Sequence, residues 1–162
     1  METIHQKKTT LYKTVIFLKL LISSLVSLLI LRIAFIALTV MSTVQPEQPY
    51  TQESSPSELL LLALVVAPVL ESLLIIGMLW ITTHFTSRKL AMIITALIFG
   101  VMHLAPGVTW VVIVMTASLG YIFTYYYYKA RSRGVSGYWL IVIIHFLSNA
   151  LSIIPEIIQF FN

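Results

Sequence analysis

Residues 59–83 read LLLLALVVAPVLESLLIIGMLWITT, a run in which Glu71 is the only charged side chain. A helix needs about 20 mostly apolar residues to cross a bilayer, so this run predicts a membrane-spanning helix. The polar stretch before it ends in Ser55-Pro56-Ser57-Glu58, a capping box with proline at the first helical position. The run therefore predicts a transmembrane helix that begins near residue 59 and carries a carboxyl group near its centre.

The composition of the whole chain agrees with a membrane protein. Hydrophobic residues make up 59% of the 162 residues and charged residues only 10%, less than half of the roughly 25% found in soluble domains. So few charges cannot cover a water-facing surface, which argues against a soluble enzyme, a disordered segment and a nucleic-acid-binding protein. The chain has no cysteine and no aspartate, which excludes disulfides, thiolate metal sites and Asp-based catalytic sets. The expected fold class is all-α, a polytopic bundle of transmembrane helices.

Apolar runs divide the chain into five predicted spans within a single integral membrane domain, residues 1–162. The first run is longer than a signal-peptide core of about 7–15 residues, and no small-residue cleavage site follows it, so a retained anchor is expected. The third run is the shortest. No internal repeat and no separate soluble domain are visible. The spans cover about residues 14–44, 59–83, 90–104, 108–128 and 138–161.

The basic residues predict the orientation of these spans. With the N-terminus in the cytoplasm, eight of the ten Lys and Arg residues fall in inner segments and none in the outer loops. This distribution follows the positive-inside rule, so a multi-pass protein of the cell membrane with an outer C-terminus is expected. The tyrosine run 125–128 is interpreted as an aromatic belt at the inner boundary. The eight inner residues are Lys7, Lys8, Lys13, Arg88, Lys89, Lys129, Arg131 and Arg133.

Four polar side chains stand out within the predicted spans, where an ionisable group is costly and marks a candidate functional site. Glu71 is in the second span, His103 near the end of the third, and His145 in the fifth, with Asn149 one helical turn later. At 1.5 Å per residue, their depths from the inner boundary are about 10 Å for His145, 16 Å for Asn149, 18 Å for Glu71 and 21 Å for His103. We therefore expect them to share one layer and a water-filled cavity. Taken singly, each also fits an interhelical hydrogen bond or pairing.

Other residues bear on the same region. Arg32 offers a partner for Glu71, although its place in the outer half of the first span favours a snorkelling side chain. Pro68 removes a hydrogen bond three residues before Glu71 and predicts a kink that opens the bundle near the carboxylate. The glycines of the spans are interpreted as helix-packing residues: Gly77, Gly100 and Gly120.

The four polar residues suit the hydrolysis of a peptide bond. Glu71 can accept a proton from water, a histidine can position that water, and His145 with Asn149 can donate hydrogen bonds to an oxyanion. No Ser, Cys or Thr is clearly paired with a base, so a covalent route is less natural. Glu71 with two histidines is also a zinc set by residue type, but the H-E-x-x-H motif is absent. No cofactor is therefore expected, and zinc remains the alternative.

Three motifs resemble those of the type II CAAX prenyl endopeptidase and bacteriocin-processing (CPBP) family. The stretch 67–77, APVLESLLIIG, resembles the first motif, which reads Glu-Glu, three residues, then Arg, commonly after Ala-Pro and before Gly. Phe99-Gly-Val-Met-His103 resembles the second motif, Phe-x-x-x-His, and His145-Phe-Leu-Ser-Asn149 resembles the third, His-x-x-x-Asn. The motifs occur in the family's order, one per predicted span, within residues 67–149.

The resemblance implies an intramembrane endopeptidase that cuts a peptide or the tail of a membrane protein, with the lipid bilayer as its other partner and no nucleic acid. In that family the Glu of the first motif activates water and the His of the second motif assists. The His and Asn of the third motif form an oxyanion hole. These roles carry over to Glu71, His103, His145 and Asn149.

Two positions depart from the first motif. Ser72 stands where the family has its second Glu, and Ile76 stands where it has Arg. If these positions only support the site, activity is retained. The alternative is a catalytically inactive member that acts as an immunity or interaction protein. A third hypothesis, a small transporter with Glu71 as proton carrier, is disfavoured because no internal repeat is visible.

Overall fold

The computed structural model describes residues 4–42, 60–104 and 110–161, and these residues form helices and no strand. The predicted all-α bundle is thereby confirmed. The predicted capping box at residues 55–58 and the end of the third span at residues 105–107 lie outside the described residues. The helices are α1 (Ile4–Ser42), the π-helical turn η1 (Leu62–Val66), α3 (Ala67–Phe85), α4 (Arg88–Val101), α5 (Trp110–Arg131) and α6 (Gly137–Phe161).

The described helices differ in whether they are long enough to cross a membrane. Three apolar segments are long enough: Lys8–Val40, Leu62–Phe85 and Trp110–Arg131. A further apolar stretch, Gly137–Ile153, belongs to α6. α4 has 14 residues, and a helix of that length is about 21 Å long, against about 30 Å for the hydrocarbon core of a bilayer. The chain is a polytopic helical membrane bundle in which α4 is too short to cross by itself.

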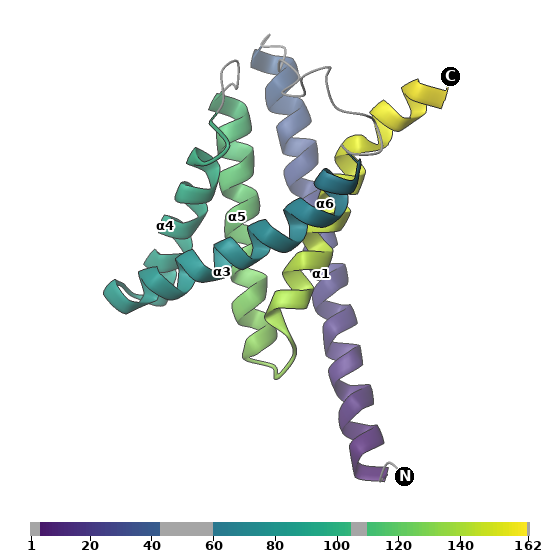
Figure 1. The fold of residues 1–162 in the computed structure, drawn as a ribbon, viewed down its shortest axis with the longest axis vertical. Coiled ribbons are helices and arrows are strands. Elements are labelled where there is room, and N and C mark those ends of the chain that lie inside the picture. Colours follow the sequence, from purple (N-terminus) through teal and green to yellow (C-terminus); the bar gives the residue numbers. More distant parts are fainter. Residues whose placement is uncertain (1–3, 43–59, 105–109, 162) are drawn as a thin grey trace.

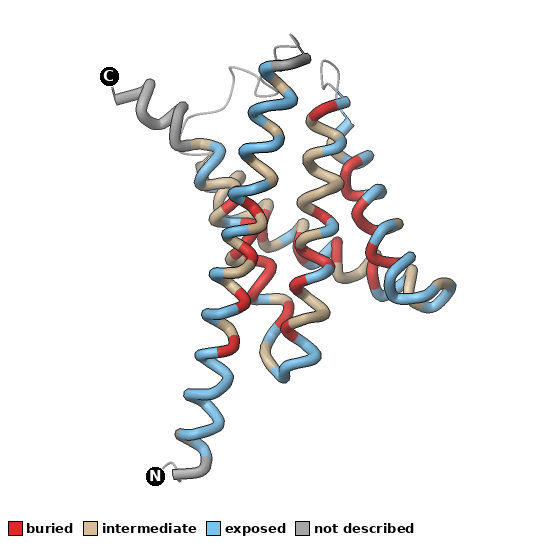
Figure 2. Tube along the Cα trace, turned by 180° about the vertical axis from the view of Figure 1, so that it is seen from behind, coloured by how far each residue is buried: buried red, intermediate tan, exposed pale blue. Residues whose placement is uncertain are grey.

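The helices pack around α5, which contacts α1, α3, α4 and α6. α4 and α5 lie side by side, while α3 crosses the bundle obliquely (Figure 1). α1 extends past the other helices at its N-terminal end, where its residues are exposed (Figure 2). α1 begins and α6 ends at opposite ends of the molecule (Figure 1). This arrangement places the obliquely running α3 against α4 and α6, which carry the other two motifs.

Glycines allow the close packing of α4 on α5. A Cβ atom at Gly100 would lie 2.8 Å from Cβ of Ala117, and one at Gly120 would lie 3.0 Å from the ring of Phe99. Both distances are shorter than an ordinary carbon–carbon contact of about 3.5 Å, so the predicted packing role is confirmed at these two positions. The prediction is wrong for Gly77, where no atom of the described residues lies within 4 Å of an added Cβ.

The tyrosine run at the end of α5 does not act as one uniform belt. Tyr126 is 4% exposed, and its hydroxyl lies 2.8 Å from Oγ of Ser23 and 3.2 Å from Oγ of Ser27, both on α1. The interfacial interpretation is therefore wrong for Tyr126. At 3.6 residues per turn, four consecutive side chains point to all sides of a helix, so one of them must face the bundle. Tyr125 is exposed, with Nζ of Lys129 5.1 Å from its ring centre.

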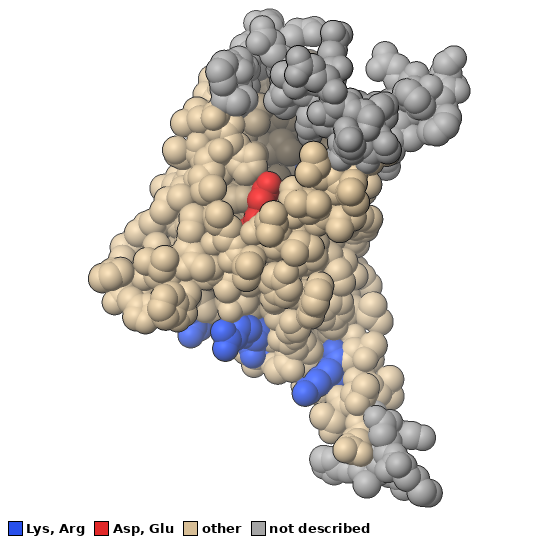
Figure 3. All heavy atoms as spheres, in the orientation of Figure 1, with Lys and Arg blue, Asp and Glu red and all other residues tan. Residues whose placement is uncertain are grey.

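The basic side chains mark one end of the molecule. In Figure 3 they gather at the end where α4 begins and α5 ends. α5 continues to Arg131, three residues beyond the predicted boundary, and cations at a helix C-terminus are favoured by the helix dipole. The segments predicted to be cytoplasmic thus share one end of the bundle. The assignment of that end to the cytoplasm stays a prediction.

Candidate active site

A cavity of about 620 Å³ lies among η1, α3, α5 and α6, beside the end of α4. Glu71 is the only acidic residue whose side chain the structure describes, and the acidic atoms in Figure 3 lie in a hollow of the surface. All four polar residues predicted from the sequence line this cavity: Glu71, His103, His145 and Asn149. The rest of the wall is mostly apolar and includes Leu62, Val66, Phe99, Val112, Met115 and Leu119.

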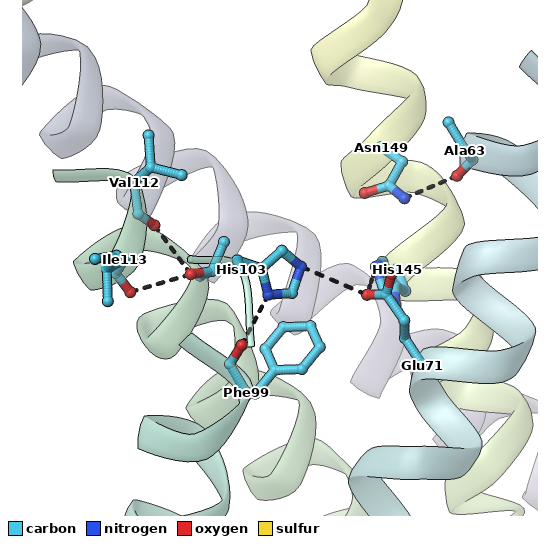
Figure 4. Close-up of polar contacts among 9 residues, drawn as sticks. Ala63, Glu71, Phe99, His103, Val112, Ile113, His145 and Asn149 are labelled. Carbon is cyan, nitrogen blue, oxygen red and sulfur yellow. Dashed lines mark hydrogen bonds and ion pairs between the residues drawn. The ribbon is translucent and has the colours of Figure 1, made fainter. Parts of the chain in front are cut away.

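The Glu71 carboxylate faces two imidazoles. Its Oε2 atom lies 3.8 Å from Nε2 of His103 and 3.6 Å from Nε2 of His145 (Figure 4). Both distances exceed the roughly 3.2 Å limit of a good hydrogen bond, so neither contact is a direct hydrogen bond. The Glu71 side chain is 34% exposed, which makes it accessible from the cavity. A small molecule bound to this carboxylate would be close to both rings.

His103 lies beyond the end of α4, which stops at Val101, and not within a membrane-spanning helix as the sequence predicted. The reason is local. The His103 backbone N–H donates to the carbonyl oxygen of Gly100 in a tighter turn, at 3.1 Å. Nδ1 of His103 lies 2.7 Å from the carbonyl oxygen of Phe99, one of the orphan acceptors in the last helical turn. A carbonyl can only accept, so Nδ1 carries a hydrogen, and Nε2 is the ring nitrogen that faces Glu71.

His145 is held in the apolar core. It is 5% exposed and packs against the rings of Phe123 and Phe99, with ring centres 4.9 Å and 6.3 Å away. Its Nδ1 atom is buried without a hydrogen-bond partner in the described part of the chain. A buried N–H without an acceptor is less favourable than a buried ring nitrogen without a donor. The hydrogen is therefore placed on Nε2, which leaves no unpaired N–H in the core. That tautomer directs an N–H donor toward Glu71 and the cavity.

Asn149 lies one turn after His145 on α6 and connects that helix to η1. Its Nδ2 atom donates a hydrogen bond of 2.8 Å to the carbonyl oxygen of Ala63 (Figure 4). A carboxamide nitrogen carries two hydrogens, so this bond uses one of them and leaves the other for a group in the cavity. The sequence placed Asn149 correctly beside the histidines, but it gave no sign of the partner, because that partner is a backbone oxygen.

Arg32 takes neither of the roles expected for it. Its guanidinium donates to the carbonyl oxygen of Ser148 at 2.5 Å and also to Oγ of Ser152. Both serines are on α6 and line the cavity. The charge that the sequence offered as a partner for Glu71 therefore ties α1 to the helix that carries the third motif.

The two positions that depart from the first motif point into the protein. Ser72 is completely buried, and its Oγ has no hydrogen-bond partner among the described residues. Ile76, four residues later, packs against the main apolar core. Neither side chain belongs to the described lining of the cavity. The two departures thus lie on the side of α3 that packs against the protein core, and the polar residues that line the cavity are unchanged.

Sequence reasoning missed several residues of the site. Phe99 lies against both imidazoles, and the spacing of four residues to His103 was an available signal for that contact. Thr116 of α5 lines the cavity, but its hydroxyl donates to the carbonyl oxygens of Val112 and Ile113.

In the described part of the chain, no group of three or more His, Cys, Asp or Glu side chains has the arrangement of a metal site.

Comparison with known proteins places the chain in a family. The model of a family described as type II CAAX prenyl endopeptidase Rce1-like matches residues 54–151. The match covers more than half of the 162-residue chain and contains all three motifs. No curated protein and no solved structure matches the chain. The chain belongs to the Rce1-like family of type II CAAX prenyl endopeptidases, which are intramembrane proteases.

Proposed function

We propose that this chain is an active intramembrane endopeptidase in which Glu71 activates the water that hydrolyses a peptide bond. The observation that carries the proposal is the position of Oε2, 3.8 Å and 3.6 Å from the Nε2 atoms of His103 and His145 inside one cavity. Family membership supports the same reaction class. A carboxylate within a membrane-spanning helix is energetically costly and marks a candidate functional site, which favours a catalytic role over a purely structural one.

The proposed reaction starts with a water molecule bound to Glu71. The lone pair on Nε2 of His103 accepts a hydrogen bond from this water and orients it toward the carbonyl carbon of the substrate. As the new carbon–oxygen bond forms, Glu71 takes the proton from the water. The proton then passes to the amide nitrogen as the carbon–nitrogen bond breaks, so that the products are a carboxylic acid and an amine.

The second half of the site would stabilise the negative oxygen of the tetrahedral intermediate. His145 presents an N–H from Nε2, and Asn149 has one amide hydrogen that Ala63 does not use. Both donors come from α6, one turn apart, and are fixed before the substrate arrives. Removing one such donor typically lowers the rate by about 10²–10³-fold.

The substitutions at positions 72 and 76 are compatible with an active enzyme. Residues four apart lie one above the other on a helix, so a Glu at 72 and an Arg at 76 would face each other. Losing one member of a buried ion pair costs about 3–5 kcal/mol, because the other charge is left unpaired. Here both members are replaced, by the buried Ser72 and by Ile76 in the apolar core. No stranded charge remains, and Glu71 keeps both imidazoles.

The cavity wall suggests what kind of substrate enters. Its apolar residues favour a peptide or a membrane-protein tail with apolar side chains next to the scissile bond. The enzyme would work within the lipid bilayer, in the plasma membrane, with no nucleic-acid partner and no resident cofactor. Cleavage sites flanked by apolar residues are therefore expected.

The test compares wild-type protein with Glu71→Gln at matched expression, by mass-spectrometric profiling of peptides and new N-termini in membranes. Glutamine keeps the shape of the side chain but removes the base, so products present with wild type should disappear. Identical product sets from the two proteins, both inserted in the membrane, would contradict the proposal. If both proteins also protect cells equally from a membrane-active peptide, the inactive immunity protein becomes the better account.

A further inference from the structure

The π-helical turn η1 leaves one backbone carbonyl without its usual partner. In an α-helix, the carbonyl oxygen of Ala63 accepts from the N–H of Ala67. Here the Ala67 N–H donates instead to the carbonyl oxygen of Leu62, five residues back. The next backbone nitrogen belongs to Pro68, which carries no hydrogen. The Ala63 carbonyl therefore depends on a side chain, and Nδ2 of Asn149 supplies the hydrogen bond.

Pro68 gives a physical reason for this turn. A proline ring inside a helix clashes with the carbonyl four residues earlier, which is that of Leu64, and a local widening of the helix relieves the clash. η1 comes directly before Ala67 and Pro68, and Pro68 is fully buried, so the ring cannot move toward solvent. The predicted kink is thus a single π-helical turn, placed opposite the third motif.

We propose that Pro68 is a positioning residue for Asn149: it frees the Ala63 carbonyl, and that carbonyl fixes which end of the Asn149 carboxamide acts as donor. Rotating the carboxamide by 180° would bring Oδ1 against the Ala63 oxygen, and two acceptors would then face each other. The NH₂ end therefore stays in place, with its second hydrogen ready for a substrate oxygen. The inference rests on the oxyanion role given to Asn149 in the proposed function.

The first test observes the Asn149 side chain directly by NMR and needs no substrate. The spectrum is simple, because the chain contains only two asparagines, Asn149 and Asn162. Protein labelled with ¹⁵N-asparagine and reconstituted in lipid bilayers should give two side-chain amide groups by NMR. Asn149→Ala assigns the signals. Pro68→Val restores an N–H at similar volume, and Pro68→Ala restores it with less bulk. Either variant should move the bonded Asn149 amide proton upfield, toward the position of an unbonded amide.

A matched control separates this effect from a general loosening of α3. Leu79 is also buried on α3, but it packs against Ala91 and Met92 of α4, at the other end of the helix. Leu79→Ala should leave the Asn149 signals unchanged. Asn149 signals that stay at the wild-type position in both Pro68 variants would overturn the inference.

Cleavage rates distinguish the positioning role from the proposed function itself. On a product found by the profiling above, Pro68→Val should lower kcat about 10-fold or more with little change in KM, and should add nothing in the Asn149→Ala background. If Asn149→Ala alone leaves cleavage unchanged, the oxyanion role fails, and this inference fails with it. If Asn149→Ala abolishes cleavage but Pro68→Val does not reduce it, only the positioning role is overturned.

Discussion

His84 and His103 are held by their helices in the same way. In each, Nδ1 lies 2.7 Å from the carbonyl oxygen four residues earlier, and the ring packs edge-on against the aromatic residue at that position. Their surroundings differ, because His103 faces Glu71 across the cavity, whereas His84 is exposed near the end of α3. Comparing variants of the two histidines therefore distinguishes the effect of these local contacts from the effect of facing Glu71.

His103→Gln should reduce cleavage about 10²–10⁴-fold, the range expected for loss of a group that assists proton transfer. His84→Gln removes the same local contacts on an exposed surface and should cleave like wild type. Rates of product formation in membranes with matched protein levels provide the comparison. Equal losses in the two variants would mean that His103 acts only through helix stability.

The proposed reaction uses water, a carboxylate and amide or imidazole donors, and does not call for a bound metal. Treating the membrane protein with a chelator that strips zinc should therefore leave the rate of cleavage unchanged. Activity lost on chelation and recovered on adding zinc would instead assign Glu71, His103 and His145 as metal ligands. The measurement is a cleavage assay before and after chelation, with metal content determined in both samples.

At the scale of elements, the site depends on how closely α4 packs on α5. α4 ends just before His103, so the position of this histidine follows from the contact between the two helices. Gly100 makes that contact possible, because Ala117 and the backbone of Ile113 occupy the space that a side chain would need. Arg32 plays the corresponding part for α6, which it ties to α1 through Ser148 and Ser152.

Gly100→Ala should lower the free energy of unfolding by about 1–3 kcal/mol, because the new methyl group overpacks the interface. Gly77→Ala is the matched control, since an added Cβ meets nothing within 4 Å there. Its effect should be at most about 1 kcal/mol and stabilising, because alanine has the higher helix propensity. Unfolding of both variants in one detergent gives the comparison, and similar losses would argue against tight α4–α5 packing.

For the molecule as a whole, the predicted orientation in the membrane can be tested by labelling single cysteines. The sequence has no cysteine, so each introduced cysteine is the only one that reacts. Ser132 is exposed between α5 and α6, in a segment predicted to be cytoplasmic. Thr51 belongs to the loop predicted to be outside. A membrane-impermeant maleimide applied to intact cells should label Thr51→Cys and spare Ser132→Cys. The reverse labelling pattern would show that the bundle has the opposite orientation in the membrane.

The helical architecture could be predicted because it depends on properties that single residues carry. Twenty apolar residues in a row must form a helix in lipid, since no water is present to satisfy the backbone. The convergence of Glu71 and His145 followed from depth along such helices. These features need no knowledge of how one helix packs on another.

What the sequence did not reveal depends on contacts between helices or on backbone atoms. His103 lies past the last residue of α4, and its ring binds the Phe99 carbonyl. Arg32 prefers a carbonyl oxygen on α6 to both roles considered for it, and Tyr126 finds two serines on α1. The acceptor of the Asn149 amide is a backbone carbonyl, which every residue has, so the residue type does not reveal it. The contacts of Arg32, Tyr126 and Asn149 required knowing which helix is the neighbour.

The shortness of α4 has a consequence for the surrounding lipid. With 14 residues, the helix is about 9 Å shorter than the hydrocarbon core of an average bilayer. A span with such a hydrophobic mismatch is accommodated when the lipid around it thins, at a cost for each ångström of deformation. The leaflet next to His103 is then compressed, and the polar headgroup layer lies nearer the Glu71 carboxylate than it would beside a full-length helix. Membrane thickness thereby becomes a variable of the proposed reaction, and thin bilayers are the ones in which the candidate site is most easily hydrated.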